Sequence, residues 1–87
     1  MDFDQELDTR GLLCPIPILK TKVAMDELRP GQVLKVVSTD PGSVRDMEAF
    51  ARQTRNPLLH SRVDGRDHIY FLRKEGAQES RKKETDR

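Results

Sequence analysis

The sequence predicts one α/β (α+β) domain, a two-layer sandwich with the order βαβαββ. A four-stranded mixed sheet should carry both helices on one face. Two helical stretches alternate with extended ones, glycine and proline punctuate the boundaries, and a hairpin signal joins the last two strands. Right-handed crossovers place two such helices on the same side of the sheet. The expected strands are 3–9, 33–39, 58–63 and 68–73. The expected helices are 15–28 and a second one that starts between 40 and 43 and ends near 55–57.

The first half of the chain should form a strand, a helix and a second strand. Phe3, Gln5 and Leu7 share one parity with mostly acidic neighbours between them, the pattern of a half-buried strand. Gly11 ends that strand, and a helix then runs from Pro15 to about Leu28. Arg29-Pro30-Gly31 stops the helix. The stretch 33–39 is rich in β-branched residues and is typical of a central strand.

The second half contains another helix and a hairpin. Two starts are open for this helix: Asp40 as the N-cap with Pro41 at the first position, or Ser43 with Asp46 three residues later. Val44, Met47, Phe50 and Ala51 would share one helical face, and the helix should end near Asn56-Pro57. Asp64-Gly65 favours a tight turn between the last two strands.

Composition excludes several classes of protein. The 87 residues make one domain, residues 1–74, followed by a charged tail, 75–87, that we expect to be disordered. Sixteen basic against fifteen acidic residues give a net charge of +1, and aromatic residues are few, so we expect no nucleic-acid partner. No stretch is apolar enough for a signal peptide or a membrane span. A single cysteine agrees with a reducing compartment. We therefore predict a cytoplasmic protein, and we expect it to be a monomer.

Cys14 is the only cysteine and the leading candidate for chemistry. Pro15 suits the first position of a helix and Pro17 still falls in its first turn, so Cys14 should be the N-cap. The positive end of the helix would favour a thiolate there and lower the thiol pKa by less than one unit, raising the thiolate fraction at pH 7 from roughly 3% to about 10–15%. Arg10 would lower the pKa further if it folded toward the sulfur, and Asp8 would oppose it.

Other interpretations of Cys14 have less support. A free cysteine is often a small buried hydrophobe, but an N-cap usually lies at the surface. Cys14, His60 and His68 are possible zinc ligands, yet none of the spacings typical of zinc sites is present, so we expect no metal. No pattern pairs a histidine with Cys14 as a cysteine hydrolase would require.

The segment from Leu7 to Pro17, with its Cys-Pro-x-Pro motif, resembles the TusA (SirA-like) sulfur-carrier family. The resemblance continues through Pro30-Gly31-Gln32 and 40–46 and covers residues 5–74. It implies the fold given above and a carrier rather than an enzyme, although its transpersulfidation chemistry is that of sulfurtransferases. Cys14 would hold the persulfide, with no other cofactor. The matched positions expected to support it are Asp8, which takes the family's acidic position, Arg10, Gly11, Pro15 and Pro17.

The resemblance also implies partners. A cysteine desulfurase or a rhodanese would donate sulfur, and another protein would accept it for tRNA thiolation, molybdenum-cofactor synthesis or oxidative sulfur metabolism. Because the chain has no second cysteine that could displace the sulfur by closing a disulfide, the cargo would stay until an acceptor arrives. The alternative is a binding or regulatory module without sulfur chemistry, with RNA as one candidate ligand. The near-zero net charge and the few aromatic residues argue against RNA.

The first helix has two apolar rows rather than one. Ile18, Thr21, Ala24, Met25 and Leu28 are wide enough to cover the sheet, and a second, narrower row consists of Ile16, Leu19 and Val23. Lys20 and Glu27 border the second row on one side, and Lys22 and Asp26 border it on the other. We expect this row to dock sulfur donors and acceptors if it is exposed, whereas a neighbouring helix could instead cover it.

Overall fold

The structure is a computed structural model that describes residues 2–75. Its elements follow the predicted order: β1 (Gln5–Thr9), α1 (Ile16–Asp26), β2 (Val33–Ser38), α2 (Ser43–Thr54), β3 (Leu58–Asp64) and β4 (Asp67–Arg73). Among these residues, no helix is long and apolar enough to cross a membrane. The predicted tail lies outside the described residues except for Glu75, whose amide donates to Asn56 Oδ1 at 3.0 Å.

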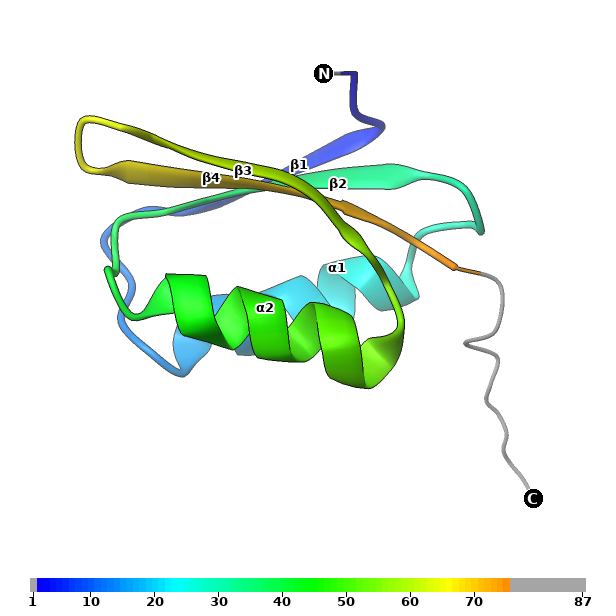
Figure 1. Ribbon diagram of the computed structural model, residues 1–87, viewed down its shortest axis with the longest axis horizontal. Helices are drawn as coiled ribbons and strands as arrows, with labels where there is room; N and C mark the ends of the chain where they lie inside the picture. Colours follow the sequence, from blue (N-terminus) through cyan, green and yellow to red (C-terminus); the bar gives the residue numbers. More distant parts are fainter. Residues whose placement is uncertain (1, 76–87) are drawn as a thin grey trace.

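The four strands form one mixed sheet in the order β1-β2-β4-β3. β1 lies parallel to β2, whereas β4 is antiparallel to both of its neighbours, β2 and β3. Both helices lie on the same side of this sheet, with α2 in front of α1 in the view of Figure 1. The predicted α+β sandwich is therefore confirmed, including its mixed strand directions.

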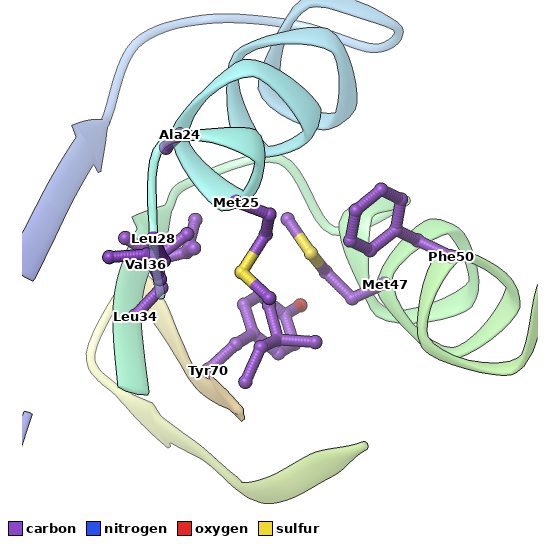
Figure 2. Close-up of a cluster of buried hydrophobic side chains, with 9 residues drawn as sticks. Ala24, Met25, Leu28, Leu34, Val36, Met47, Phe50 and Tyr70 are labelled. Atoms are coloured by element: carbon purple, nitrogen blue, oxygen red, sulfur yellow. The ribbon is translucent and has the colours of Figure 1, made fainter. Parts of the chain in front are cut away.

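The main core lies between the sheet and the two helices. Met25 of α1 and Met47 of α2 are almost fully buried and lie side by side above Tyr70 of β4 (Figure 2). Methionine suits this position because its flexible thioether fills irregular gaps between elements. The rest of this cluster consists of Ala24, Leu28, Leu34, Val36, Phe50 and Leu72.

A second, smaller apolar cluster lies on the other face of the sheet. It consists of Val37, Ile69 and Phe71, with Val33 packed against it. The Phe3 and His60 rings lie near Phe71, at centroid distances of 6.3 and 6.0 Å. Side chains of neighbouring segments thus shelter this face without a second layer of helices.

α1 is shorter than predicted at both ends, since the expected helix was 15–28. Pro15 is the N-cap of α1 and not its first residue, so the predicted position of Pro15 was wrong by one residue. At the other end, the amides of Glu27 and Leu28 bond three residues back, to Ala24 and Met25, so the last turn tightens before the predicted end.

α2 begins near the later of the two possible starts, but Gly42 and not Ser43 is its N-cap, and the Ser43 hydroxyl bonds to Tyr70 instead of capping the helix. The carbonyl of Asp40 accepts the Ser43 amide at 3.0 Å, and its side chain accepts the Gly42 amide at 3.0 Å. These two bonds form a turn that precedes the helix and is not part of it. α2 therefore begins at Ser43. Arg55 ends it in the left-handed conformation, with φ of 59°.

Candidate functional site

The loop that carries Cys14 lies beside the loop that follows β2. Because β1 and β2 are adjacent and parallel, their carboxyl ends share one edge of the sheet, and the chain leaves both strands there. The Gly11 amide donates to Thr39 Oγ1 at 2.9 Å, and the Cys14 amide donates to Asp40 Oδ2 at 2.8 Å. Gly11 has a φ of 82°, which a residue with a side chain rarely adopts. These contacts fix where the cysteine stands.

Cys14 is exposed, as predicted, but it is not the N-cap of α1. Pro15 takes that position, and the Ile16 amide bonds to the carbonyl of Leu13 at 2.9 Å. The thiol instead faces α2: Cys14 Sγ donates to Asp46 Oδ2 at 3.1 Å. The interpretation of Cys14 as a helix cap was therefore wrong, because the chain turns once more before the helix begins.

The predicted decrease of the thiol pKa was also wrong. The hydrogen bond to Asp46 raises the pKa of Cys14, and desolvation and the negative charges of Asp46 and Asp40 act in the same direction. A carboxylate that accepts a hydrogen bond from the thiol stabilises the protonated form of the sulfur, and its negative charge repels the thiolate. The free protein thus holds Cys14 mainly as a thiol at neutral pH.

A shallow hollow of about 230 Å³ opens beside the thiol, between α1 and α2. Cys14, Pro15 and Asp46 line it together with apolar side chains of both helices. The remaining lining residues are Ile18, Ala49, Phe50 and Gln53. Cys14 and Asp46 are therefore the chemically reactive and the charged group, respectively, of an otherwise uncharged hollow.

Asp8 and Arg10 form an ion pair with each other. Arg10 Nε and Nη2 donate to the two carboxylate oxygens of Asp8 at 3.0 and 2.9 Å. Arg10 also lies 3.9 Å from Asp67. The guanidinium does not fold toward the sulfur, so its predicted contribution to the thiol pKa is absent. Instead it lowers the pKa of Asp8 to about 2.

The second apolar row of α1 is exposed. The exposed fractions are 40% for Ile16, 53% for Leu19 and 60% for Val23. α2 does not cover them, and Lys20 and Lys22 beside them are exposed as well. Leu19, Lys20 and Val23 also line a second hollow, of about 360 Å³, which α1 forms with Gln5 and Leu7 of β1.

The two histidines lie on opposite faces of the sheet. His60 contacts Phe71 on the face away from the helices, whereas His68 lines a hollow with Val44 and Tyr70 on the helix side. Within residues 2–75, no group of three or more His, Cys, Asp or Glu side chains is placed to hold a metal ion.

Asp40 and Asp46 are the site residues that sequence reasoning missed. In the sequence both are helix-capping signals and part of the stretch 40–46 that resembles the family, but they lie 26 and 32 positions away from Cys14 in the chain. A signal was present, however. In the predicted topology the loops that follow two adjacent parallel strands must meet, and 40–46 follow the second of these strands.

Comparison with known proteins agrees with this architecture. The family model described as sulfurtransferase TusA matches residues 5–74. The sulfur carrier protein TusA of Allochromatium vinosum is 51% identical over 73 residues, which are 84% of this chain and 96% of that protein. YrkF of Bacillus subtilis is 45% identical over 74 residues, which are 85% of this chain but only 40% of that longer protein.

A solved structure shows the same fold. The crystal structure of a SirA-like protein from Desulfitobacterium hafniense superposes with a TM-score of 0.74, over 83% of this chain and 99% of that one, at 22% identity. Fold and site together define a two-layer α+β domain with an exposed cysteine in the loop between β1 and α1. The chain belongs to the TusA family.

Proposed function

We propose that this protein is a sulfur carrier that accepts sulfane sulfur as a persulfide on Cys14 and relays it to an acceptor protein. The observation that supports this most directly is the placement of the only cysteine. Cys14 is exposed in a loop fixed by two hydrogen bonds, at the mouth of an apolar hollow. The 51% identity to a protein named as a sulfur carrier supports the same conclusion.

The transfer needs no cofactor beyond the covalent sulfur. Cys14, once deprotonated, attacks the outer sulfur of the donor's persulfide. A new S–S bond forms on Cys14, the donor's S–S bond breaks, and the donor's inner sulfur leaves as a thiolate that takes up a proton. In sum, one thiol and one persulfide exchange a sulfur atom. Delivery to the acceptor is the same reaction with Cys14 as the leaving group.

We further propose that donors and acceptors dock on the exposed row of Ile16, Leu19 and Val23. This row begins two residues after Cys14 and lies on the outer surface of α1. Lys20 and Lys22 border it and would favour an acidic rim on the partner. A short apolar patch of this kind suits brief contact, because small interfaces give weak and reversible complexes.

Several features of the proposal follow from the sequence and the family rather than from contacts. We place the protein in the cytoplasm as a monomer, with a cysteine desulfurase or a rhodanese as donor and without nucleic-acid or membrane partners. The candidate destinations of the sulfur are tRNA thiolation, molybdenum-cofactor synthesis and oxidative sulfur metabolism.

Intact-mass spectrometry tests the proposal. The protein is incubated with a cysteine desulfurase and cysteine, or with a rhodanese and thiosulfate. Wild type should gain the mass of one sulfur atom, and a reductant should remove it. Cys14→Ser should keep its fold by circular dichroism and gain nothing. A protein that never gains sulfur from either donor would contradict the proposal.

A further inference from the structure

Asp46 contacts the thiol without serving an evident structural need. Its Oδ2 lies 3.1 Å from Cys14 Sγ, and its residue is partly buried in the first turn of α2. An acidic residue there already interacts favourably with the positive end of the helix. That role does not require a carboxylate oxygen to face the cysteine, so the contact with sulfur has a separate consequence.

The charges around the sulfur are all of one sign. Asp46 of α2 and Asp40 of the loop after β2 are the two charged groups that act on the thiol. Ile18 of α1 and Pro15, its N-cap, also line the hollow and are uncharged. Asp40 is already engaged, because its two oxygens accept the amides of Cys14 and Gly42. Asp46 has the thiol as its side-chain partner and lies at the mouth of the hollow, where an incoming group can reach it.

We propose that Asp46 is a positioning residue that keeps unloaded Cys14 as a protonated thiol and favours sulfur donors that present a cationic group, an ammonium or a guanidinium, next to the reacting sulfur. This inference rests on the proposed function and names the chemistry of its partner. The donor's cation pairs with the Asp46 carboxylate, which then no longer holds the thiol proton. The proton passes to water, and the thiolate attacks the donor's outer sulfur.

The arrangement makes Cys14 selective. In the free protein the carboxylate suppresses the thiolate, which is the form that reacts with electrophiles and oxidants. A donor without a positive charge meets this suppressed thiol and two nearby carboxylates. A donor with a positive charge cancels the repulsion at the same moment that it brings its sulfur into reach.

Small symmetrical disulfides test the idea without any sulfur donor protein. Cystamine carries two ammonium groups and 2-hydroxyethyl disulfide carries none, and each forms a mixed disulfide with Cys14 by the same exchange. The two rate constants are measured for wild type and for Asp46→Asn by mass spectrometry at low salt. Dividing the rate constant for cystamine by the rate constant for 2-hydroxyethyl disulfide cancels the effect of the thiolate fraction, which is common to both reactions of one protein.

We expect this ratio to be at least about threefold higher in wild type than in Asp46→Asn, a change equivalent to about half a pKa unit. The difference between the two ratios should become smaller at 0.5 M salt, where the Debye length is about 4 Å. Asp46→Asn should also react faster than wild type with iodoacetamide at pH 7, with its rate profile shifted to lower pH. Equal ratios, or an unshifted profile, would overturn the proposal.

Two further variants keep the test decisive. Glu48→Gln removes the same charge two positions along α2 and should keep the wild-type ratio. Asp46→Ser replaces Asp46→Asn if the latter does not fold, because serine is well tolerated near a helix start. Failure of sulfur loading in wild type would contradict the proposed function alone, since these exchange rates involve no persulfide.

Discussion

The docking row on α1 can be tested by placing a charge in it. Val23 is 60% exposed and lies in the middle of α1, where its side chain lines the hollow toward β1. Val23→Asp adds a negative charge to a surface bordered by Lys20 and Lys22. If partners bury this row, the carboxylate must be desolvated against an apolar surface, and docking becomes weaker.

The stability cost of this substitution should be small. Complete burial of a valine side chain contributes about 1.5–3 kcal/mol, so the 40% that is buried here is worth about 0.6–1.2 kcal/mol. Valine and aspartate have similar helix propensities. A loss of about 1 kcal/mol lowers the melting temperature of a domain of this size by roughly 4–8 °C. The variant should therefore remain folded at 25 °C.

The assay compares two reactions of the same thiol. Sulfur loading from a cysteine desulfurase should slow by about tenfold, the effect of about 1.4 kcal/mol lost from docking. Reaction of Cys14 with iodoacetamide should not change. Val63→Asp is the matched control, because Val63 of β3 is 64% exposed but lines neither the hollow beside Cys14 nor the hollow beside the docking row. Equal slowing by both variants, or unfolding by Val23→Asp alone, would refute the docking row.

Two further predictions concern contacts away from the thiol. Tyr70→Phe should destabilise the domain by about 1–3 kcal/mol in urea unfolding, because it leaves the buried Ser43 hydroxyl without its partner at 2.7 Å, and adding Ser43→Ala should recover most of the loss. The Asp8 carboxylate should titrate near its pKa of about 2 by carbon NMR. Its pairing with Arg10 therefore favours the folded state above the unfolded pKa of about 3.9 and is lost as the pH falls through about 2. A titration near pH 4 would show that the pair is not formed.

The fold was predictable because its signals are local. β-branched residues identified β2, Gly65 identified the hairpin, and the apolar spacing of Met47 and Phe50 identified α2. Gly65 has a φ of 63° and stands first in the two-residue turn between Asp64 and Asp67, as a tight hairpin requires. The ends of helices and strands shifted by one or two residues, and helix ends did so where turn and cap bonds compete for the same amides.

The site was predicted in part, because its reactive group is local and its electrostatics are not. The Cys-Pro context sufficed to identify Cys14 as exposed. The direction of its pKa shift depends instead on Asp46, which folding brings across from another helix. Arg10 shows a different limit, because two local partners were open to it: its guanidinium pairs with Asp8, two residues away, and not with the sulfur.

The central claim is that sulfur resides on Cys14, and peptide mapping of the loaded protein tests it most directly. After loading by a cysteine desulfurase and trapping with iodoacetamide, trypsin should cut after Arg10 and Lys20 and release the peptide 11–20, which contains Cys14. We predict that this peptide carries one additional sulfur atom and that the additional sulfur is lost after reduction. Additional sulfur on any other peptide, or a peptide 11–20 alkylated only at an unmodified thiol, would contradict the account.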